Sequence, residues 1–194
     1  MDNAVRVCRV DHTTPSVARE IHSVQIDAYT QEAELLGTAN FPPLSRTVDD
    51  IRTSPEVFLG AYGGEQLIGS ISVQPEHESR GQTISSLVVA APYRRRGIAK
   101  QLLAEVLRLH PADVLTVQTG ARNEPALTLY AQAGFVEYRR WRVGLEGFEL
   151  VKLRRVPLVT NWRMRPALSG STIPSSDNRP RIRLIIAARC STYP

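Results

Sequence analysis

Residues 87–99 read LVVAAPYRRRGIA, and this stretch decides the fold. An apolar strand leads into a turn with three consecutive arginines, and a helix is expected to begin at Gly97. The first N–H groups of a helix have no partner within it, and the helix dipole adds positive charge there. Gly97 and the small Ala99 allow close approach to the backbone. The stretch therefore predicts a strand–turn–helix cradle for a pyrophosphate.

Elements on either side of the cradle follow from hydrophobic periodicity. Downstream, one helical face carries Ile98, Leu102, Val106 and Leu109, and Pro111 ends the helix. Upstream, two alternating apolar runs flank Gly63-Gly64, which predicts a β-hairpin. The predicted strands are 4–10, 57–62, 67–73, 83–90, 114–119, 135–143 and 148–155. The predicted helices are 15–36, 97–110 and 123–133, with a short one over 47–53.

The first helix has clear end signals. Thr13-Thr14-Pro15 supplies a capping hydroxyl and a proline for the first turn, and Gly37 is expected to stop the helix. Residues 38–45 contain consecutive prolines and are predicted as a loop. Hairpins at both ends and a β-α-β crossover in the middle predict an α/β fold with a mixed sheet and helices on both faces.

A second motif lies at 115–135, which read LTVQTGARNEPALTLYAQAGF. A strand is followed by N-x-x-A-x-x-L-Y-x-x-x-G-F, starting at Asn123. This pattern resembles the second motif of the GNAT N-acetyltransferase superfamily. The cradle, Arg94-x-x-Gly97-x-Ala99, resembles that family's [Q/R]-x-x-G-x-[G/A] motif, and both motifs occur in the family's order. The chain is thus similar to small bacterial-type GNAT proteins over about residues 4–154.

The resemblance implies the GNAT acyl-CoA N-acyltransferase fold, with six or seven strands and about four helices. It also implies an enzyme that transfers an acetyl group from acetyl-CoA directly to a primary amine of a small molecule or protein. Tyr130 would be the general acid that protonates the leaving thiolate, or else only a packed aromatic. Asn123 would reach the coenzyme arm or cap its helix. The implied coenzyme-binding residues are Leu87, Val88, Val89, Arg94, Arg95, Arg96, Gly97, Ile98, Ala99, Lys100, Asn123 and Tyr130.

The general base is not marked by a motif, since 83–89 read TISSLVV and lack the Glu that some relatives carry there. A base is needed because an amine with a pKa near 10.4 costs about 4–5 kcal/mol to deprotonate at pH 7. Glu34 is the tentative choice. Alternatives are Glu32, Glu76, His77 and Glu78, or a water ordered by Ser85 or Ser86. Residues 29–44 are expected to form either a substrate lid or an ordinary loop.

The chain divides by composition into a domain over 1–154 and an Arg- and Pro-rich extension over 155–194, expected to be poorly ordered. The extension carries a net charge of +6 and the domain −1, so nucleic-acid binding by the domain is not expected. The two cysteines lie far apart and the four histidines lack ligand spacing, which favours a reducing cytoplasm and no metal site. No signal peptide or membrane span is expected.

Two other functions remain open from the sequence. The first is a non-catalytic domain that binds or senses acyl-CoA, and the missing strand Glu favours it. The second is a nucleic-acid adaptor that uses the basic extension. The resemblance also leaves room for a homodimer, because many relatives dimerise.

Overall fold

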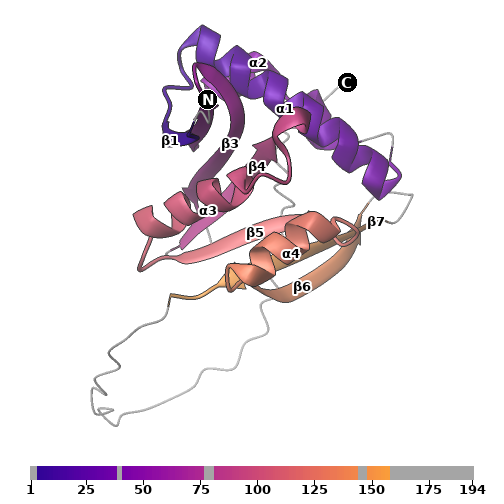
Figure 1. Cartoon of the computed structure of the whole chain (residues 1–194). Coiled ribbons are helices and arrows are strands. Elements are labelled where there is room, and N and C mark those ends of the chain that lie inside the picture. The colour runs from indigo at the N-terminus through magenta and orange to yellow at the C-terminus, as the bar shows by residue number, and fades with distance from the viewer. Residues whose placement is uncertain (1–3, 39–40, 77–80, 144–147, 158–194) are drawn as a thin grey trace.

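The computed structural model describes residues 4–38, 41–76, 81–143 and 148–157. Within them lie one seven-stranded sheet and four α-helices (Figure 1). The strands are β1 (Arg6–Arg9), β2 (Val57–Gly63), β3 (Gln66–Pro75), β4 (Gly81–Val89), β5 (Val114–Gly120), β6 (Val136–Val143) and β7 (Phe148–Arg155). The helices are α1 (Pro15–Leu36), α2 (Val48–Arg52), α3 (Ile98–Leu109) and α4 (Glu124–Gln132). The predicted extension lies outside the described residues from 158 onward.

The sheet is mixed, as predicted. Its strand order is β1-β2-β3-β4-β5-β7-β6. Only the β4–β5 pair is parallel, and α3 makes the crossover between these two strands; the other neighbours are antiparallel. The predicted hairpin appears as β2–β3, in which Val57 pairs with Val73.

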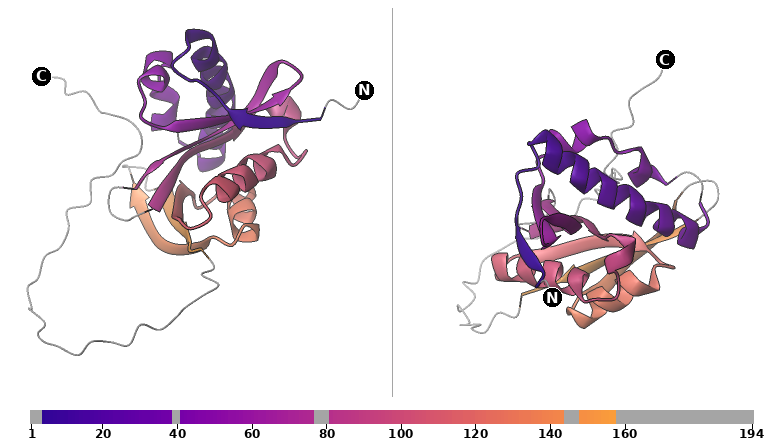
Figure 2. Two further views of the ribbon diagram at one scale, coloured as in Figure 1. Left: turned by 90° about the vertical axis from the view of Figure 1, so that its left-hand side faces the viewer. Right: turned by 45° about the horizontal axis from the view of Figure 1, so that its top comes forward.

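Helices cover both faces of the sheet, with α1 and α2 on one side and α3 and α4 on the other (Figure 2). On the α3 side, Leu102 and Val106 pack with Ile71 and Val117 in the largest apolar cluster. Helix α3 lies tight against the sheet at Gly69, where a Cβ would come within 3.3 Å of the side chains of Ile98 and Leu102. Both faces of the central strands are therefore buried, which fixes the strand register that the site depends on.

The ends of α1 confirm the predicted boundaries but correct one contact. Pro15 occupies the first turn and Gly37 adopts a left-handed conformation with a φ of 68°. Thr14 is the N-cap residue, yet its side chain makes no cap hydrogen bond. Its hydroxyl donates to Asp11 at 3.1 Å instead, and Asp11 also binds Thr13. The local turn thus uses the hydroxyl groups that the sequence assigned to capping.

Two other expectations were wrong in detail. The stretch predicted as a loop contains a 3₁₀ helix, η1 (Pro42–Ser45), because two prolines preset the backbone φ angle for a tight turn. Leu109 was expected on the buried face of α3, but 46% of it is exposed. Leu109 is the last residue of the helix, whereas Val106, about one turn earlier, is fully buried.

The β4–β5 pair opens partway along its length. Pairing runs from Gly81 with Val114 to Ile84 with Val117 and then stops. In the same region the β3–β4 register shifts, so that Ser72 pairs with Ser86 and Val73 with Ile84. Ser85 is thereby an extra residue in a β-bulge, which bends the strand away from its neighbour. The gap between the two strands is where the candidate site lies.

No helix among the described residues is both long enough and apolar enough to cross a membrane.

Candidate functional site

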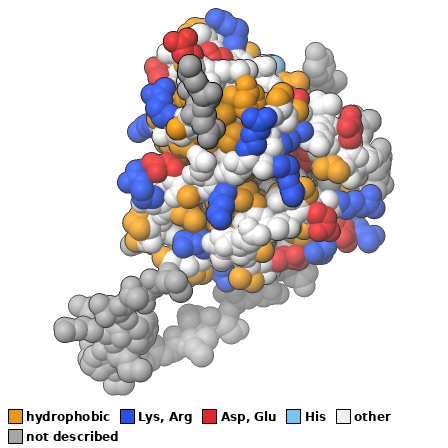
Figure 3. Space-filling model, viewed as in Figure 1, with side chains coloured by type: hydrophobic (Ala, Val, Ile, Leu, Met, Phe, Trp, Pro, Cys, Tyr) orange, Lys and Arg blue, Asp and Glu red, His pale blue; other side chains and the backbone are white. Residues whose placement is uncertain are grey.

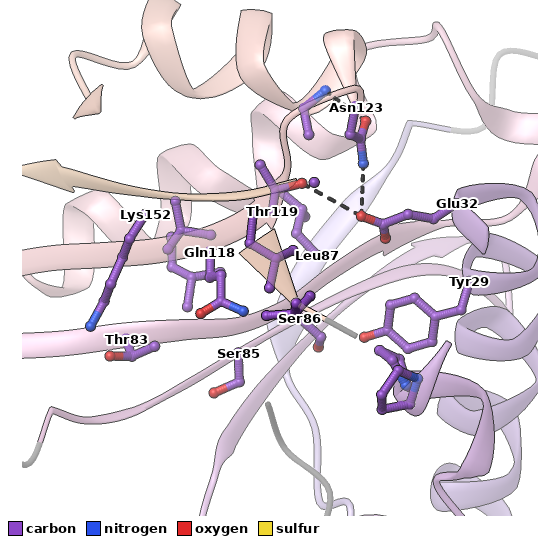
Figure 4. A pocket seen from close by; sticks show the side chains of 18 of the residues that line it. Tyr29, Glu32, Thr83, Ser85, Ser86, Leu87, Gln118, Thr119, Asn123 and Lys152 are labelled. Atoms are coloured by element: carbon purple, nitrogen blue, oxygen red, sulfur yellow. Dashed lines mark hydrogen bonds between the residues drawn. The ribbon is translucent and has the colours of Figure 1, made fainter. Parts of the chain in front are cut away.

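A cavity of about 530 Å³ opens where β4 and β5 part. Helix α1 and η1 form one wall, and the face of β4, β5, β7 and β6 forms the floor (Figure 4). Residues from the start of α4 and Tyr130 close one end. Three residues of the predicted coenzyme set, Leu87, Asn123 and Tyr130, line the cavity.

The predicted cradle has the backbone of an anion site. Arg95 and Gly97 are both left-handed, with φ angles of 62° and 79°. Among the described residues, no acceptor is recorded for the backbone N–H groups of residues 95–100. The first regular hydrogen bond of α3 runs from the Gln101 N–H to the Gly97 carbonyl at 3.0 Å. Lys100 is the last residue before it. The turn therefore gathers free N–H donors at the positive end of a helix.

The side chains of the cradle take different directions. Ile98 is buried in the core and Ala99 is half-buried, so these residues offer only their backbone N–H groups to a ligand. The guanidinium of Arg96 lies over the ring of Tyr93, 5.5 Å from its centre. Several basic side chains gather between α1 and α4 on this face of the molecule (Figure 3).

Arg94 points toward α1, which the sequence did not predict. Its Nε donates to the Val89 carbonyl at 3.0 Å, and its guanidinium binds both Asp27 and Gln31. Asp27 also accepts the backbone N–H of Ala91 at 2.7 Å. Helix α1 is therefore tied to the turn that precedes the cradle, and Arg94 ties the two together through its side chain.

The end of β4 keeps one edge free. Val88 packs beneath α1, whereas Leu87 faces the cavity. On the other side, β3 pairs with β4 up to Val89. Beyond Ile84, no β4–β5 pairing is recorded in the described residues, so this edge has room for an added extended chain.

Glu32 is the acidic group of the cavity. Its carboxylate accepts from Asn123 Nδ2 at 3.0 Å and from Thr119 Oγ1 at 3.5 Å (Figure 4). Burial raises the pKa of Glu32 above its ordinary value, and the two hydrogen bonds offset only part of that rise. A half-buried carboxylate with a raised pKa is a stronger base than an exposed one.

Glu34, the tentative base from the sequence, lies elsewhere. It is exposed on α1 and is not among the residues that line the cavity. Two residues along a helix correspond to a rotation of about 200°, so Glu32 and Glu34 face opposite ways. Of these two carboxylates, only Glu32 lines the cavity.

The other candidate bases divide between the cavity and its surroundings. Glu76 lines the far end of the cavity, where Lys152 Nζ donates to it at 2.8 Å. Burial would raise the pKa of Glu76, but hydrogen bonds from Lys152 and two threonines outweigh it and hold the pKa low. Ser86 is buried and bonded to Ser72 at 2.7 Å. His77 and Glu78 lie outside the described residues.

Ser85 and Ser86 were alternative candidates to order a water, and of the two only the Ser85 hydroxyl has no hydrogen-bond partner among the described residues. Its Oγ is buried and has no hydrogen-bond partner among the described residues, and the residue lines the cavity. The bulge in β4 explains its orientation, because an extra residue turns the following side chains relative to the partner strand.

Two tyrosines in the cavity remain neutral. Burial raises the pKa of Tyr130, and the negative charge of Glu32 raises it further. Burial raises the pKa of Tyr29 in the same way, and its hydroxyl points toward Ser86 (Figure 4). The Tyr130 ring packs edge-on against Phe135, with 5.4 Å between ring centres. A packed, protonated phenol can donate a proton from a fixed position.

Asn123 caps α4, which is one of the two roles predicted for it. Its Oδ1 accepts from the Ala126 N–H at 3.2 Å. The same side chain donates to Glu32 across 91 positions of sequence, so the cap and the acidic group are positioned together. Helix α4 ends at Gln132, and the left-handed Gly134 and buried Phe135 follow it.

Sequence reasoning missed several cavity residues. Tyr29 is one of them; it lies three positions before Glu32, an alternative base, and so shares a face of α1 with it, a signal that the sequence contained. Arg139 and Trp141 on β6 also line the cavity, although the sequence marked them only as part of a strand. Part of the stretch 29–44, expected to be either a substrate lid or an ordinary loop, forms a wall of the cavity, since Phe41, next to η1, lines it.

Within the described part of the chain, no three His, Cys, Asp or Glu side chains gather in a way that could hold a metal ion.

The sequence is similar to a family model and to several known proteins. A model of the acetyltransferase (GNAT) family matches residues 19–135. The UPF0157 protein YqkA of Bacillus subtilis is 36% identical over 155 residues, covering 77% of this chain and 45% of that protein. The N-alpha-acetyltransferase MAK3 of Arabidopsis thaliana is 29% identical over 109 residues, covering 51% and 55%. The chain thus spans about half the length of these curated relatives.

Solved structures share the architecture. The ribosomal-protein-S18-alanine N-acetyltransferase of Escherichia coli superposes with a TM-score of 0.64, covering 84% of this chain and 99% of that one. Its sequence identity is 13%, so this similarity concerns the fold alone. Because the family model covers more than half of the residues, and the strand order and both motifs agree with it, the chain belongs to the acetyltransferase (GNAT) family.

Proposed function

We propose that this protein is an acetyl-CoA-dependent N-acetyltransferase that acts on a primary amine. The observation that carries the proposal is the pairing of Glu32 with Tyr130 in one cavity. Burial raises both pKa values, which makes the carboxylate a stronger base and keeps the phenol protonated. Two groups with opposite proton-transfer roles in one cavity are the signature of acid–base catalysis.

The residues present fit acetyl-CoA. The free N–H groups of 95–100 suit the pyrophosphate, and a Cβ added at Gly97 would meet no atom within 4 Å, which indicates open space above the turn. The free edge of β4 at Leu87 suits the extended pantetheine arm. The coenzyme supplies an activated thioester when bound. Asn123, already engaged as a cap and with Glu32, would contact the arm only by exchanging one of these bonds.

The chemistry then follows from the positions of the side chains. Glu32 takes a proton from the acceptor ammonium, and the neutral nitrogen attacks the thioester carbonyl carbon. The carbon–sulfur bond breaks, Tyr130 gives its proton to the departing sulfur, and the second proton that the nitrogen loses as the amide forms returns to the Tyr130 phenolate. For an α-amine, with a pKa of about 7.7–8.0, deprotonation at pH 7 costs only about 1 kcal/mol. A carboxylate with a raised pKa is therefore adequate for this class of acceptor.

We further propose a polypeptide α-amine as the acceptor. Three of the relatives found are named N-alpha-acetyltransferases. The cavity also extends across four strands, from Ser85 on β4 to Trp141 on β6, which suits an elongated acceptor better than a compact one.

The test is a thiol-release assay with acetyl-CoA and a panel of amines that includes short unblocked peptides, lysine side chains and small polyamines. Release of coenzyme A that depends on the amine, and falls sharply in Tyr130→Phe, would support the proposal. Tight binding of acetyl-CoA without release for any amine would instead favour the non-catalytic acyl-CoA sensor. If acetyl-CoA did not bind at all, the assignment of the cradle would be wrong.

A further inference from the structure

The floor of the cavity carries a row of polar side chains that runs away from Glu32. Gln118 on β5 pairs in register with Lys152 on β7, and Lys152 pairs in register with Arg139 on β6. Residues paired in register project from the same face of a sheet. All three line the cavity, and Figure 4 shows Gln118 and Lys152 along its floor. Two strand spacings place Arg139 about 10 Å from Gln118.

Four cations line the cavity, and three of them have carboxylate partners. Arg46 binds the buried Glu56 at 3.0 Å, and Lys152 binds Glu76 at 2.8 Å. Arg142 binds Glu149 at 3.3 Å. These three charges are already balanced, so a ligand would gain little new attraction from them.

Arg139 differs from the other three. Within the described residues it has no carboxylate partner, and its recorded contact is with Trp141, over whose ring the guanidinium lies at 5.2 Å. The indole Nε1 of Trp141 is buried and likewise has no hydrogen-bond partner among the described residues. The guanidinium of Arg139, stacked on the ring, and the indole N–H of Trp141 are therefore two donors that a hydrogen-bond acceptor on a ligand could use.

We infer that Arg139 and Trp141 form a subsite for a carboxylate of the acceptor, and that the preferred acceptor is a polypeptide whose second or third residue is acidic. This inference rests on the proposed function, because Glu32 must hold the amine end. An extended chain advances about 3.3 Å per residue, so the third residue lies about 7 Å from the first. The side chain of a glutamate at that position extends the reach further, toward Arg139 on β6.

The opposite charges at the two ends of the cavity set the direction of the acceptor. Glu32 attracts the ammonium group, and Arg139, two strands along the floor from Gln118, attracts the carboxylate. A peptide bound the other way round would place like charges together at both ends. The subsite therefore selects orientation as well as sequence.

The test uses two unblocked six-residue peptides that differ only in Glu or Gln at the third position. Coenzyme A release gives kcat and KM for the native protein and for Arg139→Gln, Arg139→Lys and Arg140→Gln. Arg140 is the matched control, because it neighbours Arg139 on β6 but binds Glu137 and Glu149 outside the cavity. Calorimetric binding of each peptide, with coenzyme A present, gives a readout that does not need turnover.

We expect the native protein to prefer the Glu peptide by about tenfold in kcat/KM, mainly through KM, as one charge-assisted contact allows. Arg139→Gln should abolish the preference, Arg139→Lys should keep part of it, and Arg140→Gln should keep all of it. An equal response to both peptides in the native protein, or an unchanged preference in Arg139→Gln, would overturn the inference. Preferential binding of the Glu peptide without turnover would sustain the subsite and refute the proposed enzyme; no binding of either peptide would overturn the subsite.

Discussion

Replacing Glu32 with Gln separates its role in proton transfer from its role in the structure. The amide oxygen of Gln can still accept from Asn123, which now donates at 3.0 Å, so the link between α1 and α4 persists. The change removes the charge-assisted part of that bond, worth about 1 kcal/mol, and also the cost of holding a charge in a half-buried place. These effects oppose each other, and the free energy of unfolding should change by less than about 1 kcal/mol. At 2–4 °C per kcal/mol for a domain of this size, the Tm should move by no more than about 4 °C.

Activity should respond far more strongly than stability. Loss of a general base lowers kcat by about 10²–10⁴-fold, and the lower limit corresponds to about 2.7 kcal/mol in the barrier. Because a base must be ionised, native activity should fall as the pH drops through the raised pKa of Glu32. That acidic limb should be absent from the variant. The assay is coenzyme A release with a saturating peptide acceptor across pH 5–9, beside thermal unfolding of both proteins.

The matched control is Glu34→Gln, which removes an equal charge from the exposed side of the same helix. Its kcat should remain within a factor of two or so of the native value. If Glu32→Gln kept kcat within about threefold of native, or if Glu34→Gln were the variant that lost activity, the assignment of the base to the cavity carboxylate would be refuted.

The pH dependence of stability has the opposite sign to that of activity. An acid whose pKa is higher in the folded than in the unfolded state favours folding while it is protonated. Glu32 therefore contributes most below its unfolded pKa, and that contribution is lost as the pH rises through the folded value. Native protein and Glu32→Gln should differ in urea-unfolding free energy by an amount that grows with pH over this window and then levels off.

Three further changes test other parts of the structure. Tyr130→Phe should keep the Tm within a few degrees, because the ring still packs on Phe135, yet kcat should fall at least about tenfold for lack of the donated proton. Gly97→Ala forces a side chain into a φ of 79° at a cost of about 1–2 kcal/mol, and calorimetry should show acetyl-CoA binding weakened by about tenfold. Glu56→Gln leaves the guanidinium of Arg46 buried without its partner; at about 3 kcal/mol, the Tm should fall by about 10 °C in a calorimetric scan. An unchanged Tm in Glu56→Gln would mean that water or another group compensates Arg46.

Much of the fold follows from local patterns in the sequence. The Gly63-Gly64 turn, the stop at Gly37 and the cap at Asn123 each depend on residues within a few positions of one another. Where local rules failed, a competing local contact explains the difference: Asp11 takes the hydroxyl of Thr14 that would otherwise have capped α1.

The site was less predictable, because its contacts join distant parts of the chain. Glu32 was a candidate among several, and its bond to Asn123 appears only once α1 lies across the end of β5. The link from Asp27 to Arg94 arises in the same way. Arg139 carries no local signal at all, since its place in the cavity depends on the register of β6 with β7.

The parting of β4 from β5 also has a consequence for how the protein holds together. The half-sheets on either side are joined directly by the pairing of 81–84 with 114–117, so the middle of the sheet has few hydrogen bonds across it. Unpaired strand edges usually invite association with other chains, but this edge faces inward and admits only a slender extended ligand. Amide hydrogen exchange at 85–89 should therefore slow as acetyl-CoA is added, and the stability of the whole domain should rise with its concentration by mass action. The proposed coenzyme would then act as the missing strand, and its supply would set how firmly the two half-sheets stay together.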